Sequence, residues 1–120
     1  MTDPHERLQK LGLTLPAPPA AVASYVPTVL VPLGDGRSLL YISGQVSVQD
    51  GKRLTGRCPD EVSIEEAQVA ARACGLNLLA QMEAAVGLAN VEKVVQLIGF
   101  VLSTRFCSQR PNTIAPCPRY

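Results

Sequence analysis

One long amphipathic helix is the feature that most constrains how this 120-residue chain can fold. Ser63 and Glu66 form an S-x-x-E capping box, which opens a helix by satisfying its free amide groups. The segment 67–86 is rich in strong helix formers, and Gly87 can end it. Small and apolar residues recur along it every three or four positions, at Ala67, Ala70, Ala71, Cys74, Leu78, Met82 and Ala85. Such a helix needs another layer to cover this stripe, and its small residues favour close packing on a sheet.

Strands are predicted on both sides of this helix. Tyr25–Leu33 and Ser38–Ser43 flank a Gly-Asp-Gly turn, a pattern typical of a hairpin, and two prolines place the first strand at a sheet edge. Val94–Leu102 is nearly all apolar, which predicts a strand buried on both faces. The predicted fold class is therefore α+β, with the helix on one face of a sheet and a right-handed crossover after it.

Shorter signals complete the predicted order of elements. Asp3–Glu6 is typical of a helix start, with Gly12 as its stop. Three prolines within Leu15–Ala20 require an extended chain. Asp50-Gly51 predicts a tight turn, and Arg53–Pro59 is typical of a loop.

The last 17 residues differ in composition from the rest. Residues 1–103 carry a net charge of −2 and residues 104–120 a net charge of +3, which together give the +1 of the chain. Three prolines exclude a regular helix or a central strand from this tail. We therefore expect one domain over residues 1–103, followed by an irregular tail over residues 104–120.

Composition excludes several classes of protein. An apolar fraction of 47% with 18% charged residues is not that of a disordered chain. The near-zero charge argues against a nucleic-acid partner or an anionic membrane surface. We expect no membrane span, because no run of eighteen apolar residues occurs, and a cytoplasmic location, because the acidic N-terminus lacks the apolar core of a signal peptide.

Most reactive side chains have an ordinary structural explanation. The only histidine, His5, lies in the first turn of a terminal helix, so a Ser-His or Cys-His arrangement is not expected. Glu65 and Glu66 are explained by helix capping. We expect no metal site, since the four cysteines show no C-x-x-C spacing, and Cys74 is expected to be a small buried residue. These cysteines are Cys58, Cys74, Cys107 and Cys117.

Ser43 and Gly44, at the end of the second predicted strand, allow two interpretations. A hydroxyl beside a residue without Cβ suits a wall that approaches the polar group of a ligand. The same pair is also typical of a β-bulge that only turns the sheet. The residues by themselves favour neither.

Several segments together resemble the RidA/YjgF family, also called Rid or L-PSP endoribonuclease-like proteins. They are the RLxxLGLxLPxPP pattern of residues 7–19, Tyr25-Val-Pro, LYISGQ at 40–45, the helix of 65–82 and VVQLIGFV at 94–101. The resemblance covers about residues 7–103. Its specificity comes from the combination and order of the segments, since no single one would suffice.

The resemblance implies a chorismate-mutase-like α+β fold and a homotrimer with small-molecule clefts between subunits. The implied activity is hydrolysis of reactive 2-imino acids, such as 2-iminobutanoate and 2-iminopropanoate, to 2-keto acids and ammonia, with no metal or organic cofactor. Some members are instead ribonucleases or inhibitors of translation. Carried over by motif, Tyr25, Ser43 and Gly44 would bind the substrate, and Phe100 falls only approximately at a pocket phenylalanine.

The chain departs from the family pattern after residue 103. The family's arginine for the substrate carboxylate lies in an R-x-x-V strand segment, followed by a Glu-rich last strand, and neither occurs in this chain. None of Arg105, Arg110 and Arg119 lies in such a motif, so none takes that role, and no catalytic residue is assigned. The changed tail suggests a frameshifted or alternatively ended gene product. We thus expect an impaired deaminase, with a non-catalytic small-molecule-binding or regulatory trimer, or an inactive truncated product, as the alternatives.

Overall fold

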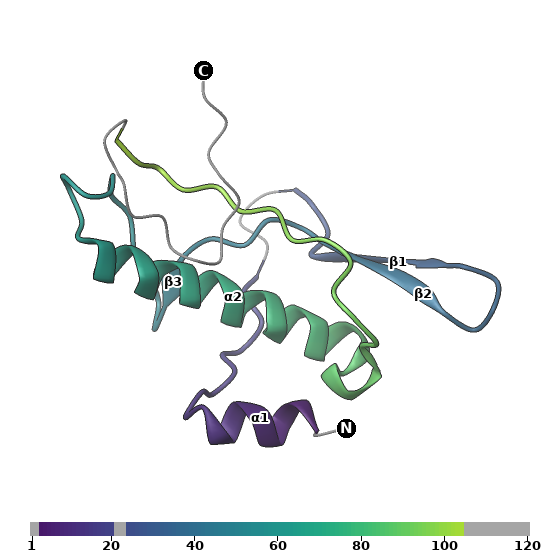
Figure 1. Cartoon of the computed structure of the whole chain (residues 1–120). Helices are drawn as coiled ribbons and strands as arrows, with labels where there is room; N and C mark the ends of the chain where they lie inside the picture. The colour runs from purple at the N-terminus through teal and green to yellow at the C-terminus, as the bar shows by residue number, and fades with distance from the viewer. Residues whose placement is uncertain (1–2, 21–23, 105–120) are drawn as a thin grey trace. The chain divides into compact units, whose positions relative to one another are not determined.

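The computed structural model describes residues 3–20 and 24–104 (Figure 1). Its elements in chain order are α1 (Pro4–Lys10), β1 (Thr28–Pro32), β2 (Ser38–Ile42), β3 (Val48–Gln49), β4 (Lys52–Arg53), α2 (Ile64–Val86) and a short 3-10 helix, η1 (Leu88–Asn90). Antiparallel pairing joins β1 to β2 and β3 to β4. This mixed architecture confirms the predicted α+β class. The tail predicted over residues 104–120 lies, apart from Thr104, outside the described residues.

The chain divides into two compact units. The first contains residues 1–46 and 74–92, and the second contains residues 47–73 and 93–120. The boundary falls within α2. The first unit thus holds α1, the β1–β2 hairpin, the second part of α2 and η1, whereas the second holds the β3–β4 hairpin and the first part of α2.

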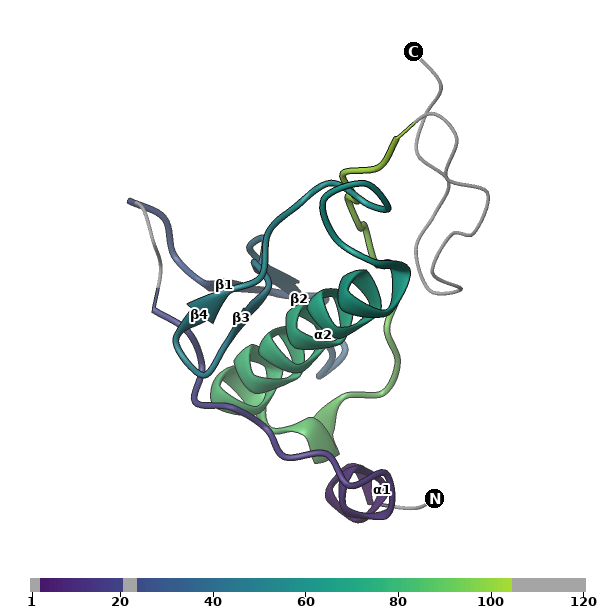
Figure 2. The same cartoon turned by 90° about the vertical axis from the view of Figure 1, so that its left-hand side faces the viewer.

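The N-terminal helix α1 of the first unit has the predicted ends. The Asp3 carboxylate accepts a hydrogen bond from the His5 amide at 3.2 Å, and Pro4 occupies the first turn, where its missing N–H costs nothing. Beyond the helix, the Gly12 amide donates to the Gln9 carbonyl at 2.9 Å. The helix lies beside η1 (Figure 2).

The predicted hairpin is confirmed, with a shorter first strand. Its register pairs Thr28 with Ile42 and Pro32 with Ser38, so Tyr25 lies before β1 rather than within it. At the loop the Leu33 amide donates to the Arg37 carbonyl at 2.9 Å. The hairpin is therefore a local structure that needs no partner strand to form its ladder.

In the second unit the predicted tight turn connects β3 to β4. Asp50 has a φ of 50° and Gly51 a φ of 76°, two successive left-handed residues as in a type I′ turn. The Leu54 amide continues the pairing with a bond of 2.8 Å to the Ser47 carbonyl. The loop predicted from Arg53 therefore begins one residue later, since Arg53 still pairs with Val48.

The capping box at the start of α2 contains both of its reciprocal hydrogen bonds. The Ser63 hydroxyl accepts a hydrogen bond from the Glu66 amide at 3.1 Å, and the Glu66 carboxylate accepts one from the Ser63 amide at 2.7 Å. The helix runs without a break to Val86, and the Gly87 amide then donates to the Glu83 carbonyl at 3.0 Å. Both predicted ends of this helix are confirmed.

We expect Ser63→Ala to lower the free energy of unfolding by about 1 kcal/mol, because it removes the side-chain acceptor of this cap. Thermal unfolding followed by circular dichroism at 222 nm measures the loss. Ser63→Thr is the control, since it keeps a hydroxyl at the same position. A Ser63→Ala protein as stable as the wild type would show that the capping box contributes nothing.

The most buried line of α2 differs from the predicted stripe. Ala73 in the second unit, and Asn77, Ala80 and Gln81 in the first, are at most 5% exposed. The predicted stripe is half-buried instead, except Ala85, which is exposed. Apolar periodicity missed this line because two of its four members are amides that the fold satisfies with hydrogen bonds.

The prediction of a buried strand over Val94–Leu102 is wrong. This segment of the second unit belongs to no strand, and Val95 is 71% and Phe100 92% exposed. A single parallel bridge follows it, in which the Cys58 amide donates to the Leu102 carbonyl at 3.0 Å. Among the described residues the two-stranded sheets offer it no neighbouring strand, so the predicted crossover is not formed either.

Candidate functional site

The structure places the two predicted site segments next to each other in the first unit. The Ser43 hydroxyl donates to the Val26 carbonyl at 2.7 Å, and the Ser43 amide donates to the Pro27 carbonyl at 2.9 Å. These bonds extend the β1–β2 ladder by one step beyond the strand ends. The Ser43-Gly44 turn therefore lies alongside the segment that carries Tyr25.

The turn is open on the side of Gly44. Gly44 is exposed, and no described atom lies within 4 Å of the position that a Cβ would take there. Ser43 is half-buried and Tyr25 is 39% exposed. Because β2 ends at Ile42, the pair follows the strand instead of forming a bulge inside it. The pair is therefore not a bulge within β2, and its contact with a ligand stays a prediction.

The hydrogen bonds of Ser43 limit what the turn can do chemically. Its hydroxyl proton is donated to the Val26 carbonyl, which leaves the oxygen lone pairs as acceptors. The Gln45 side-chain amide donates to the Ser43 carbonyl at 3.0 Å and tightens the turn. Ser43 thus offers an acceptor for a ligand N–H, whereas the Tyr25 phenol can donate or accept.

Two arginines, Arg37 and Arg57, already form ion pairs with neighbouring carboxylates. Neither guanidinium is free to bind a substrate carboxylate without losing that pair. At the hairpin loop the Arg37 guanidinium contacts the Asp35 carboxylate at 2.7 Å, which lowers the pKa of that carboxyl below its usual value. In the second unit Arg57 contacts Asp60 at 2.5 Å, and this bond likewise lowers the pKa of Asp60. The three arginines of the tail lie outside the described residues.

Two buried amides of α2 donate to backbone carbonyls of the first unit, and the sequence patterns did not single them out. The Asn77 side-chain nitrogen donates to the Val46 carbonyl at 3.1 Å, and that of Gln81 donates to the Pro19 carbonyl at 2.9 Å. All four residues belong to the first unit. The signal that could have found them is a pair of amides four residues apart within an otherwise apolar part of the helix.

The other candidate residues have structural roles. The His5 imidazole lies 3.4 Å from the Glu83 carboxylate, which also accepts the Leu88 amide at 2.7 Å, so this contact joins α1 to the end of α2. Glu66 is used in the capping box, and Glu65 is exposed. Phe100, the approximate match to a pocket phenylalanine, is 92% exposed.

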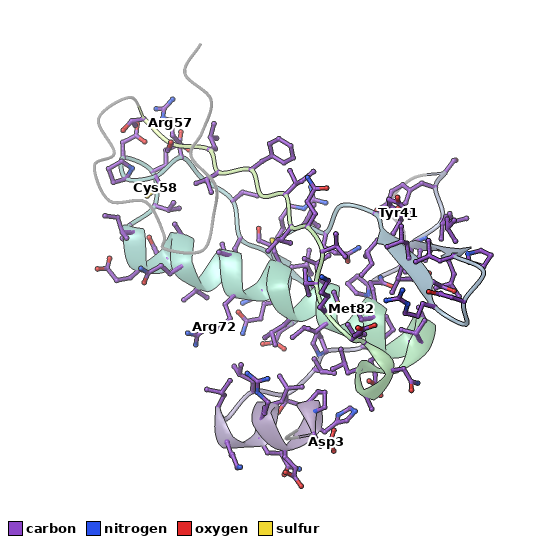
Figure 3. All side chains as sticks on the ribbon, turned by 45° about the vertical axis from the view of Figure 1, so that its right-hand side comes forward. Asp3, Tyr41, Arg57, Cys58, Arg72 and Met82 are labelled. Atoms are coloured by element: carbon purple, nitrogen blue, oxygen red, sulfur yellow. The ribbon has the colours of Figure 1, made fainter. Side chains whose placement is uncertain are left out.

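The described cysteines show no sign of a reactive centre. Cys58 is a buried thiol whose backbone pairs with residues 102–104, and it lies beside Arg57 on the loop before α2 (Figure 3). Burial raises the pKa of the Cys74 thiol, which disfavours the nucleophilic thiolate. Cys107 and Cys117 lie outside the described residues. In the described chain no three His, Cys, Asp or Glu side chains gather as metal ligands would.

None of the helices within the described residues is long and apolar enough to cross a bilayer.

Comparison with known proteins finds a relative from Trypanosoma cruzi named Protein TCP17, which is 40% identical over 99 residues. The match covers 81% of this chain and 59% of that protein, so the chain spans less than two thirds of its relative's length. No family model and no solved structure matches. The chain is thus similar to TCP17 over most of its own length.

Proposed function

We propose that this chain is a RidA/YjgF-type protein that binds a small 2-imino acid at Tyr25, Ser43 and Gly44 and hydrolyses it only weakly. One observation carries the proposal: the Ser43 hydroxyl bonds to the Val26 carbonyl at 2.7 Å, so the two segments that the resemblance assigns to the substrate are held together. We also propose a chorismate-mutase-like fold, for which the order of helix, hairpin and long helix is the support.

The chemistry requires three things of such a site. Water must attack the imine carbon, the nitrogen must stay protonated, and the substrate carboxylate must be anchored. Addition of water to the C=N bond forms the C–O bond and leaves an amine on the same carbon. A proton then moves from the oxygen to the nitrogen, the C–N bond breaks as the C=O bond forms, and ammonia and a 2-keto acid are released. Ser43 can accept the iminium N–H, since its own proton is already donated to Val26. No cofactor is needed for this hydrolysis.

The anchor is the requirement for which the sequence lacks the family's R-x-x-V motif. Arginine suits a carboxylate because its guanidinium binds both oxygens at once. In this chain Arg37 and Arg57 are occupied by Asp35 and Asp60. Removal of one partner from a buried charge pair typically costs about 2–5 kcal/mol, so weak binding and slow turnover follow.

We expect release of ammonia from freshly generated 2-iminopropanoate to stay within tenfold of the uncatalysed rate. The assay is coupled detection of ammonia, with 2-keto acid measured in parallel and Ser43→Ala as the control. A rate more than tenfold above background would show that the chain is not impaired. Binding is tested separately by NMR titration with 2-oxobutanoate, the stable product. If titration of the wild type gives no saturable chemical-shift change at Ser43 or Gly44, the proposed ligand is wrong.

A second candidate is a non-catalytic small-molecule-binding or regulatory homotrimer that uses the same turn. The observation that favours it is the open space at Gly44 together with the ion pairs of Arg37 and Arg57. This second candidate predicts saturable binding of 2-oxobutanoate and no hydrolysis of 2-iminopropanoate. An inactive truncated product, the third possibility, predicts neither.

A further inference from the structure

We infer that Asn77 is a positioning residue for the Ser43-Gly44 turn, and this inference rests on the function proposed for that turn. Asn77 is 2% exposed and belongs to α2. Its side-chain nitrogen donates to the Val46 carbonyl at 3.1 Å, across 31 positions of the sequence. An amide is costly to bury unless it forms hydrogen bonds, so a buried amide that donates to a backbone carbonyl helps to hold that segment in place.

The bond matters for the turn because Val46 lies only two residues after Gly44. On the other side of Gly44, the Ser43 amide and hydroxyl are bound to the carbonyls of Pro27 and Val26. Gly44 therefore lies between two anchors, one on the β1–β2 hairpin and one on α2. Because glycine has the largest backbone freedom and Gly44 has open space around it, the rigidity of the turn depends on these two anchors together with the bond from the Gln45 side chain to the Ser43 carbonyl.

Gln81 supplies a matched control within the same helix. It is 4% exposed, lies one helical turn after Asn77, and donates to the Pro19 carbonyl at 2.9 Å. The segment that it holds already has a restricted backbone, since Pro16, Pro18 and Pro19 fix their own φ angles. Loss of the Gln81 bond thus removes a buried amide of the same kind without releasing the Ser43-Gly44 turn.

The experiment compares Asn77→Leu with Gln81→Leu in the full chain by ¹⁵N relaxation. We expect the order parameter of the Gly44 amide to fall from about 0.85 in the wild type to below about 0.6 in Asn77→Leu. We expect Gln81→Leu to leave it unchanged, although both variants lose thermal stability. A Gly44 amide that stays rigid in Asn77→Leu, or loosens equally in Gln81→Leu, would overturn the inference.

Two further measurements keep the test decisive. Asn77→Gln retains the donor but moves it by one methylene group, so we expect an intermediate order parameter; this variant replaces Asn77→Leu if the latter does not fold. In titrations with 2-oxobutanoate we expect Asn77→Leu to raise the Kd at least fivefold and Gln81→Leu less than twofold. A wild type that binds no 2-oxobutanoate overturns the proposed ligand, whereas the order parameters still decide whether Asn77 positions the turn.

Discussion

Gly56→Ala is expected to lower the free energy of unfolding by about 3 kcal/mol, a large part of the 5–15 kcal/mol that keeps a typical domain folded. Gly56 has a φ of 144°, a conformation that costs other residues about 1–3 kcal/mol. A Cβ at this position would also collide with the Val62 Cγ1, and such overpacking costs about 1–3 kcal/mol. Thermal unfolding measured by circular dichroism should show a midpoint lowered by about 10 °C.

The effect should spread beyond Gly56 because the next residues form both side-chain and backbone bonds within the second unit. Arg57 bonds to the Asp60 carboxylate through its guanidinium, and its amide donates to the Glu61 carboxylate at 2.8 Å. Cys58 then pairs with the chain after Val94–Leu102, since the Thr104 amide donates to its carbonyl at 2.9 Å. A displaced residue 56 would disturb both sets of bonds at once.

Two variants separate the collision from the backbone strain. Gly56→Ala combined with Val62→Ala removes the colliding methyl, so we expect it to recover the steric part of the loss and leave the part due to φ. Gly44→Ala is the matched control, because an added Cβ there meets no described atom within 4 Å and its φ is ordinary. A Gly56→Ala protein that melts within 2 °C of the wild type would contradict this account of the loop.

The confirmed sequence predictions depend on neighbours within a few residues. The capping box of Ser63 and Glu66 and the turn at Asp50-Gly51 are each determined by side chains and backbone angles inside one short segment. The hairpin of β1 and β2 needs only a loop that allows the strands to meet. Local chemistry therefore predicts where elements begin and end in this chain.

The failed prediction depends on partners far along the sequence. Val94–Leu102 has the composition of a buried strand, yet burial requires neighbouring strands and a covering layer, which a single segment does not encode. The candidate site shows the same limit. The residues left open whether Ser43-Gly44 approaches a ligand or only turns the sheet, and the bonds from Ser43 to Val26 and from Asn77 to Val46 cross 17 and 31 positions. No short pattern contains both partners.

The assembled protein is expected to have about three times the 12.8 kDa mass of one chain in light scattering, as the proposed homotrimer requires. The physical reason is the uncovered apolar surface of the segment 94–102. Its large side chains are 60–92% exposed, at Val94, Val95, Leu97, Ile98, Phe100 and Leu102. Each such side chain gains about 1.5–3 kcal/mol when it is fully buried, so further copies of the chain have a strong reason to cover them.

Lysine residues introduced into the segment 94–102 should dissociate the trimer into monomers. We expect Ile98→Lys combined with Phe100→Lys to give a monomer at the same protein concentration, because an unpaired ammonium group buried in a contact between subunits costs several kcal/mol. Gln96→Lys is the matched control, since it adds the same charge to the same segment at a residue that is already polar and exposed. A monodisperse monomer for the wild type, or a trimer that persists in the double variant, would show that subunit contacts do not cover these residues. Loss of the trimer in Gln96→Lys as well would assign the effect to charge alone, and the exposed apolar side chains would then need another explanation.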